Sequence, residues 1–261
     1  MHHKRTKEML GIIDASRWKR IVIVADNHGN MIDCATEKVL FKVIDDWKPD
    51  IRIHLGDFLN LDALRIGASP EEKRDGLRED IAAGMEFVKR FRPDVLTEGN
   101  HDWRLKRELN SNDAVKREWC EDRVDEIKKL TKSIKTQVFG WGVKTGVYQI
   151  AGQKMLHGYS NGSQSATRTT AAKFGPCVHG HNHTGDFYYL DTYDYQGRFA
   201  QSCPSMCDND KMGYQQGQTA SFKHMSGFAL GIADVKKMMY FGGNVIKLPN
   251  GSFVMMEPKA I

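Results

Sequence analysis

Thr97-Glu98-Gly99-Asn100-His101-Asp102 directly follows a short apolar run, Asp94-Val95-Leu96, in a chain of 261 residues. An apolar run that leads into a glycine indicates a β-strand ending in a tight turn, where α/β proteins often keep their chemistry. Alone, a Gly-Asn-His-Asp quartet is a weak indication of a site. Four fragments of the same kind stand around it: Asp26-Asn27-His28, Gly56-Asp57-Phe58-Leu59-Asn60, His157-Gly158 and Gly180-His181-Asn182-His183. Each follows a predicted strand and offers only oxygen or imidazole ligands, so the five fragments predict one shared site.

The first half of the chain has an α/β pattern. The continuous β-branched run Ile21-Val22-Ile23-Val24 predicts a strand that is buried on both faces. A helical stripe from Val39 to Trp47 follows, with Asp33 as its expected N-cap, and then a second strand over 51–55. Such steps, with polar residues at the strand ends, predict a parallel sheet with its site at the carboxyl edge. His54 lies inside the second strand and is expected to be a core histidine rather than a ligand.

From Thr136 onward, short strands with glycine turns predominate. Helices are expected over 77–91, 113–135 and 163–174, and strands over 136–139, 143–150, 154–156, 176–179, 187–191, 198–202, 227–233 and 252–256. We therefore predict an α/β fold with two packed sheets flanked by helices. The expected organisation is a single domain over residues 1–261, with a helical insertion at about 61–135.

The composition is that of an ordinary globular protein, with 40% hydrophobic and 27% charged residues. A formal charge of +5 permits a phosphate-bearing or nucleic-acid partner without requiring one. No run approaches the roughly 20 apolar residues of a membrane span, and no apolar region follows the basic N-terminus. We expect a cytoplasmic protein without a membrane partner. Five cysteines without a Cys-x-x-Cys pair are expected to be reduced thiols.

Together, the five fragments resemble the signature blocks of the calcineurin-like metallophosphoesterases, over residues 26 to 183. The resemblance implies a four-layer sandwich with two mixed β-sheets. It also implies hydrolysis of phosphate esters by attack of a hydroxide bound to two metal ions. Within this superfamily, Gly99 to Leu105, Cys203-Pro204 and Gly227-Phe228 resemble members seen in bacteriophage genomes. A phage-encoded protein in the host cytoplasm is therefore one setting that the sequence suggests.

The metal ligands follow partly from chemistry and partly from the resemblance. Two ions roughly 3.5–4 Å apart need a shared ligand, and the carboxylate of Asp57 can bridge with its two oxygens. The resemblance implies that Asp26, His28 and His183 join it on the first metal, and that Asn100, His157 and His181 join it on the second. Oxygen and imidazole ligands without cysteine suit Mn²⁺, Fe or Zn²⁺. We expect two divalent ions, with Mn²⁺ first and Fe, Zn, Ni or Mg as alternatives.

Three further residues are candidates for a role in catalysis or substrate binding. The resemblance implies that His101 stabilises the transition state or protonates the leaving oxygen, and that Asp102 orients His101 and raises its pKa. Arg65 lies in a polar loop, 61–76, which leaves the strand end that carries Asp57. It is a candidate for phosphate binding, and a solvated loop is the alternative.

The sequence therefore predicts a two-metal phosphoesterase with a phosphate-ester substrate. A phosphodiesterase that acts on a nucleic acid or a nucleotide is the first hypothesis. Two alternatives stay open: a phosphomonoesterase of the same superfamily, and a non-catalytic, metal-containing nucleic-acid-binding protein. An intact His101-Asp102 pair favours an enzyme, because a purely structural metal site does not need it. The fold itself does not choose the substrate, and the sequence carries no signal for an oligomeric state.

Overall fold

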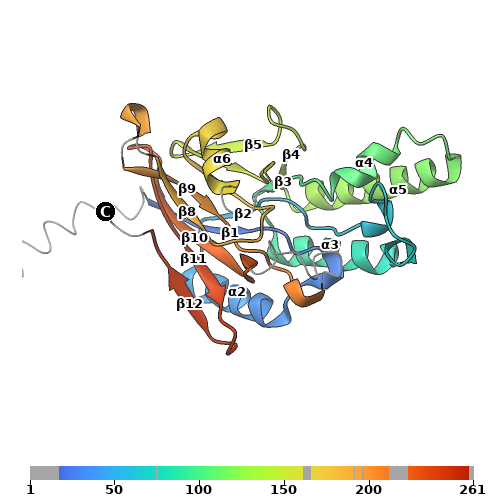
Figure 1. Ribbon diagram of the computed structural model, residues 1–261, viewed down its shortest axis with the longest axis horizontal. Helices are drawn as coiled ribbons and strands as arrows, with labels where there is room; N and C mark the ends of the chain where they lie inside the picture. Colours follow the sequence, from blue (N-terminus) through green and yellow to red (C-terminus); the bar gives the residue numbers. More distant parts are fainter. Residues whose placement is uncertain are drawn as a thin grey trace, which may run out of the picture.

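Two β-sheets form the centre of the molecule, and helices cover their outer faces (Figure 1). The structure is a computed structural model that describes residues 18–74, 76–160, 166–190, 192–195, 197–211 and 223–258. The start of the helix expected over 163–174 lies outside these residues, as do both ends of the expected domain.

The larger sheet has seven strands and carries the first three fragments of the predicted site. In spatial order its strands are β12 (Phe253–Met256), β11 (Met239–Lys247), β10 (Gly227–Asp234), β1 (Trp18–Val24), β2 (Ile51–His54), β3 (Val95–Thr97) and β4 (Gln137–Phe139). Strands β1 to β4 are parallel, whereas β10 pairs with β1 in the antiparallel sense. The carboxyl ends of β1, β2 and β3 therefore meet at one edge.

The smaller sheet has five strands and carries the two histidine fragments. Its order is β5 (Val147–Ile150), β6 (Gln153–Leu156), β7 (Cys177–His179), β9 (Arg198–Ser202) and β8 (Phe187–Leu190). Strands β6, β7 and β9 are parallel, so the residues after β6 and β7 leave the sheet at the same edge.

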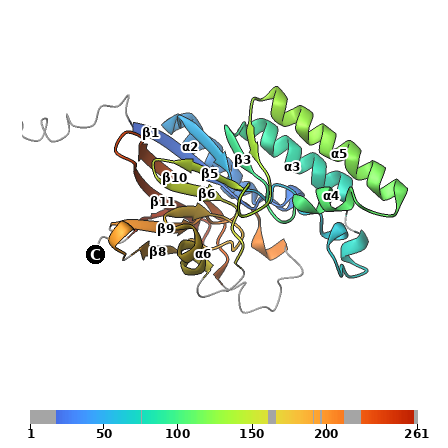
Figure 2. The ribbon, with the colours of Figure 1, turned by 90° about the horizontal axis from the view of Figure 1, so that it is seen from above.

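Helices form the two outer layers. They are α2 (Cys34–Trp47), α3 (Leu77–Phe91), α4 (Trp103–Glu108), α5 (Ala114–Ser133) and α6 (Ala166–Phe174). Helices α2 and α3 pack on the outer face of the larger sheet, and α6 packs on the outer face of the smaller one. Helix α5 lies beside α3 (Figure 2). The order helix, sheet, sheet, helix confirms the predicted four-layer α/β sandwich.

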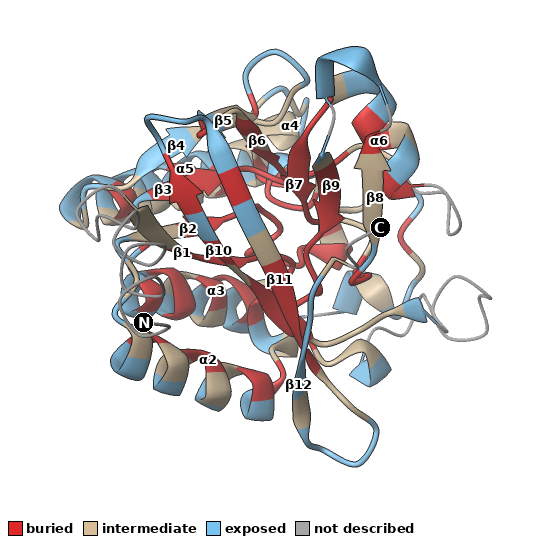
Figure 3. Ribbon diagram, turned by 90° about the vertical axis from the view of Figure 1, so that its left-hand side faces the viewer, coloured by how far each residue is buried: buried red, intermediate tan, exposed pale blue. Residues whose placement is uncertain are grey.

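Strand β1 shows why the sheets pack as they do. Ile21 and Ile23 contact the core between the two sheets, whereas Val22 and Val24 contact the core under α2 and α3. The strand is therefore buried on both faces, as its β-branched run predicts (Figure 3). Asp33 caps α2 as expected, because its Oδ1 accepts a hydrogen bond of 2.7 Å from the backbone N–H of Thr36.

Two elements differ from the sequence analysis. Strand β11 was not predicted, because Gly242 and Gly243 in its middle resemble a turn. A Cβ on Gly242 would overlap with the Tyr240 side chain, so glycine serves close packing there. Helix α4 was also not predicted. It has six residues, too few for an apolar stripe to be recognised.

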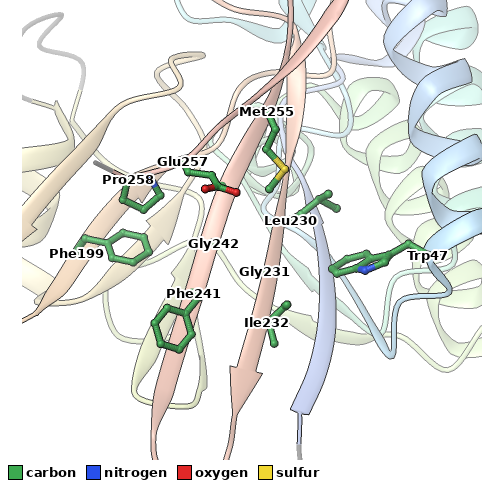
Figure 4. A pocket seen from close by; sticks show the side chains of 11 residues that line it. Trp47, Phe199, Leu230, Gly231, Ile232, Phe241, Gly242, Met255, Glu257 and Pro258 are labelled. Carbon is green, nitrogen blue, oxygen red and sulfur yellow. The ribbon is translucent and has the colours of Figure 1, made fainter. Parts of the chain in front are cut away.

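An apolar groove of about 490 Å³ lies on strands β10 to β12, beside Trp47 at the end of α2 (Figure 4). Ile232, Phe241 and Met255 line it and are 40%, 51% and 50% exposed. Among the described residues, its lining includes none of the predicted ligands. The groove is therefore not the predicted metal site, which lies elsewhere on the molecule.

Two expectations from composition can be compared with the structure. All five cysteines lie in the described part of the chain, and none of them forms a disulfide. Within that same part, none of the helices has the length and the apolar character that crossing a bilayer requires.

Candidate metal centre

The predicted ligands converge where the carboxyl edges of the two sheets meet. The loops after β1, β2, β3, β6 and β7 carry Asp26 and His28, Asp57, Asn100, His157, and His181 with His183, respectively. Three sets of three side chains each bring one ligand atom within 4.8 Å of the others: Asp26, His28 and His183; Asp57, His157 and His181; and His28, Asp57 and His101. Five strand ends that are distant in the sequence thus form one cluster, and most of its side chains are buried.

The first set has the spacing of ligands around one ion. His28 Nε2 lies 3.1 Å from His183 Nε2, which lies 3.7 Å from Asp26 Oδ1. Ligand atoms at about 2.0–2.2 Å from one ion lie roughly 3 Å or a little more apart. Asp26 Oδ1 is buried and has no hydrogen-bond partner among the described residues. Because such an atom is costly to leave unpaired, it supports a bound cation here.

The second set is arranged around His157. Its Nε2 lies 3.0 Å from Asn100 Oδ1, 3.2 Å from Asp57 Oδ2 and 3.2 Å from His181 Nδ1. Four potential ligand atoms therefore face one another, one from each of four loops. Asn100 points its amide oxygen into the cluster, as the ligand role implied by the sequence requires.

The backbone of the cluster is strained. Asp26, His28, Asp57, His181 and His183 have φ angles between 48° and 75°, in the left-handed region that residues other than glycine rarely adopt. Such conformations persist where the surrounding structure enforces them, and they are concentrated at functional sites. The strain indicates that the loops are built to aim these side chains.

Contacts outside the cluster fix the orientation of two imidazole rings. His157 Nδ1 lies 2.8 Å from the carbonyl oxygen of Leu55, so its Nε2 faces the cluster. His183 Nδ1 lies 3.2 Å from Asn209 Oδ1. Partners of this kind set the tautomer and the angle of ligand histidines. Asn209 was missed in the sequence analysis, because no motif marks a residue in this distant loop.

Two glycines allow the loops to approach one another. A Cβ on Gly99 would overlap with the Asp57 carboxylate, and a Cβ on Gly180 would lie 2.7 Å from Asp26 Oδ2. The glycines of the Gly99-Asn100-His101-Asp102 and Gly180-His181-Asn182-His183 fragments therefore have a steric role. They let the side chains of neighbouring loops enter the same small volume.

Electrostatics favours the metal-binding form of some of these side chains and opposes it in two others. Burial raises the pKa of Asp26 to about 8, and the charge of Asp57 outweighs burial and raises the pKa of His157 to about 9. Burial lowers the pKa of His28 and His183 well below the usual value and lowers that of His181 to about 3. These rings are neutral at pH 7 and offer nitrogen lone pairs. Burial raises the pKa of Asp57, but the charges of His157 and His101 outweigh it and lower that pKa well below the usual value. The carboxylate is thus ionised.

The structure corrects the expected role of Asp102. Its carboxylate accepts hydrogen bonds from the backbone N–H groups of Asp57 and Gly99 through Oδ2 and of Leu59 through Oδ1. It therefore holds the turn that carries Asp57 and does not hold the His101 ring. Asp102 precedes α4 directly, and the start of the helix turns its side chain toward the backbone of the neighbouring loop.

His101 has other partners. Its Nδ1 lies 2.6 Å from the carbonyl oxygen of Asn60, and its Nε2 lies 3.1 Å from Arg104 Nη2. The ring stands at the rim of the cluster, with Nε2 3.9 Å from Asp57 Oδ2. No motif in the sequence assigns a role to Asn60 or Arg104. His101 precedes α4 by two residues and Arg104 lies in its first turn, so their spacing of three residues was the sequence signal for this contact.

His54 and Arg65 lie outside the cluster. His54 is fully buried, with its Nε2 2.8 Å from Asn27 Oδ1, which confirms the predicted core histidine. Arg65 is partly exposed in the loop after Asp57, and its Nε donates to Glu72 Oε1 at 3.0 Å. The described contacts of Arg65 therefore tie it to its own loop.

A family model supports the same conclusion as the geometry. The model described as calcineurin-like phosphoesterase matches residues 19–201, a range that contains all seven predicted ligands. No curated protein matches the sequence.

Among solved structures, Vps29 from Chaetomium thermophilum is 13% identical in sequence to this chain. The alignment covers 93% of this chain and 97% of the Vps29 chain, with a TM-score of 0.46. Vps29 from Cryptosporidium parvum is 10% identical, and the alignment covers 92% of this chain and 97% of that chain, with a TM-score of 0.46. Yfce, a phosphoesterase from E. coli, is 17% identical, and the alignment covers 90% of this chain and 96% of that chain, with a TM-score of 0.39.

Proposed function

The chain belongs to the calcineurin-like phosphoesterase family, and from this premise we propose that it is a two-metal phosphodiesterase that acts on a nucleotide or a nucleic acid. The observation that carries the proposal is the convergence of seven oxygen and nitrogen ligands from five loops, with the buried Asp26 Oδ1 left unpaired among the described residues. A fold alone would not support an activity, but this donor set does.

The residues of the cluster divide between two ions. Asp26, His28 and His183 would hold one, Asn100, His157 and His181 the other, and Asp57 would bind both. Ions at these positions would polarise a phosphate oxygen and would lower the pKa of a bound water. A donor set of oxygen and imidazole ligands without cysteine suits Mn²⁺, Fe or Zn²⁺, and we propose Mn²⁺ first, with Fe, Zn, Ni and Mg as the alternatives.

The chain itself positions the ester and supplies the leaving-group chemistry. His101 stands beside the cluster, close enough for its ring to act at the leaving oxygen. Asp102 acts indirectly, because it holds the turn of Asp57 in place. We assign His101 a catalytic role and Asp102 a positioning role.

A nucleotide substrate is supported by aromatic side chains near the second set of ligands. The ring centroid of Trp141 lies 5.6 Å from that of His157 and 4.6 Å from that of Tyr159. Both aromatic residues are only partly buried. Bases stack on such surfaces without strict sequence preference. A diester is supported by Arg104, the arginine that contacts His101 beside the cluster: its guanidinium group is bound to Asp62, so it is not placed to clamp a terminal phosphate dianion.

The proposal predicts a preference among small substrates. With Mn²⁺, turnover of bis(p-nitrophenyl) phosphate should exceed turnover of p-nitrophenyl phosphate, because no described arginine clamp favours the dianion. Steady-state rates on the two esters, measured with one enzyme preparation, decide the question. The opposite ranking would favour the phosphomonoesterase alternative.

Arg65 gives a second prediction. The carbonyl oxygen of Asn60 and the carboxylate of Asp62, at the start of its loop, contact Arg104, so the loop borders the cluster. Arg65→Ala should raise KM for a nucleic acid more than KM for a small chromogenic ester. Arg74→Ala, an exposed arginine of the same loop, is the matched control. If both substrates respond equally to Arg65→Ala, the loop has no part in recognition.

The alternative from another class is a non-catalytic, metal-containing protein that binds nucleic acid. Elemental analysis, combined with a panel of monoester, diester and DNA substrates, separates the three candidates. Two metals with turnover of diesters supports the proposal. Two metals and tight DNA binding without turnover of any ester would favour the non-catalytic alternative.

A further inference from the structure

We infer that Arg104 is a positioning residue that keeps His101 out of the metal coordination sphere. The inference rests on the proposed two-metal function and adds a residue outside the implied ligand set. It explains why a histidine beside the ions would be left to act on the substrate.

The contacts of Arg104 define the state of the His101 ring. Arg104 is 7% exposed, and its Nη2 lies 3.1 Å from His101 Nε2. A guanidinium group can only donate hydrogen bonds, so Nε2 is the acceptor. The proton of the neutral ring is then on Nδ1, which donates to the carbonyl oxygen of Asn60 at 2.6 Å. Both ring nitrogens are thus engaged by the protein in the substrate-free enzyme, and His101 can protonate a leaving oxygen only after Nε2 takes up a proton and exchanges Arg104 for the ester.

Without Arg104, the same ring would be a good metal ligand. His28, Asp57 and His101 each bring a ligand atom within 4.8 Å of the others, and all three are buried. The ring centroids of His28 and His101 are 4.5 Å apart. The lone pair of His101 Nε2 accepts a hydrogen bond from Arg104 and is therefore not available to bind an ion. The buried positive charge beside it also repels a dication. Arg104 therefore excludes this third arrangement of ligands.

Arg104 is itself held firmly. Its Nη1 donates to Asp62 Oδ1 at 2.8 Å and to the carbonyl oxygen of Asn60 at 2.7 Å. Asp62 is 3% exposed and also accepts from the Asn60 side chain. Breaking a buried ion pair is costly, so the guanidinium has little freedom to leave His101. A lysine could not reproduce the planar fork that reaches three acceptors.

The test removes Arg104 without leaving a buried charge unpaired. The double variant Arg104→Met with Asp62→Asn keeps the approximate volume and removes both members of the ion pair. Arg107→Met is the matched control, because Arg107 lies on the same helix and contacts Glu108 and the carbonyl oxygen of Leu64. Arg104→Lys retains a charge for Asp62 and serves if the double variant does not fold. Each variant is also made with His101→Ala.

Two measurements report the tautomer of the His101 ring and the coordination of the bound ions. In the metal-free protein, two-bond ¹H–¹⁵N spectra of the imidazoles should show His101 as the Nδ1–H tautomer, and both Arg104 variants should lose this single tautomer. In the Co²⁺-loaded protein, the visible absorption of the Arg104 variants should differ from the wild type, because His101 joins the coordination sphere. The difference should vanish when His101→Ala is added. We also expect kcat to fall by about 10²-fold from misplacement of the ring.

Several outcomes would overturn the inference. A wild-type His101 with its proton on Nε2 would contradict the assigned tautomer. A Co²⁺ spectrum that Arg104 substitution does not change would show that Arg104 excludes nothing, and a change that persists with His101→Ala would have another origin. If the wild type binds no metal and cleaves no ester, the proposed function fails, and the tautomer measurement still decides the contact between Arg104 and His101.

Discussion

Asp57→Asn should bind at most one metal equivalent and lose roughly 10³-fold or more in kcat, since several kcal/mol of charge stabilisation disappear with the shared carboxylate. Asp57 is 1% exposed, and its Oδ2 lies 3.2 Å from His157 Nε2. Its Oδ1 accepts from the backbone N–H of His101 at 2.8 Å. An amide retains the size of the carboxylate but lacks the negative charge that holds two cations together.

Elemental analysis and steady-state kinetics on the same samples measure this effect. Asp80→Asn is the matched control, because Asp80 is buried and accepts two backbone N–H groups but belongs to none of the candidate metal sets. Two full equivalents of metal in Asp57→Asn would contradict the bridging assignment. An equal loss of metal in Asp80→Asn would show that the effect comes from folding rather than from ligation.

His101→Ala should separate catalysis from metal binding. Loss of a proton donor at the leaving oxygen costs about 10²–10⁴-fold in rate. Both metal equivalents should stay, because the wild-type ring is bound to Asn60 and Arg104 and not to an ion. The rate loss should be much smaller for esters with good leaving groups, which need no proton.

The measurement compares kcat for a p-nitrophenyl diester with kcat for an alkyl diester, alongside metal content and thermal unfolding. Loss of metal in His101→Ala would mean that the ring is a ligand, as its grouping with His28 and Asp57 would allow. An unchanged rate on the alkyl ester would mean that His101 is not the acid.

The fold was largely readable because its signals are local. The β-branched run at Ile21 to Val24 identifies a strand buried on both faces, and Asp33 identifies the start of a helix, from a few adjacent residues each. Strand β11 was missed because its paired glycines carry the signal of a turn. Only the packing of Tyr240 against Gly242 shows why glycine is needed in an extended strand.

By itself, the sequence indicated which side chains could hold metal, through the resemblance of its five fragments to the calcineurin-like metallophosphoesterases. The five fragments combine short polar motifs with strand ends, and parallel strands deliver their ends to one edge of a sheet. Chemistry of this kind is carried by residue type and by position within a fragment, so it can be recognised without coordinates.

Only the tertiary structure decided which groups hold those side chains in place. Asp102 was expected to hold His101 but binds three backbone N–H groups, whereas His101 is held by Asn60 and Arg104. Asn209 orients His183 from a loop that carries no motif. Hydrogen-bond partners depend on distances of a few tenths of an ångström between loops that are far apart in the chain. These distances are set by how the sheets and helices pack, and not by the residues next to each site.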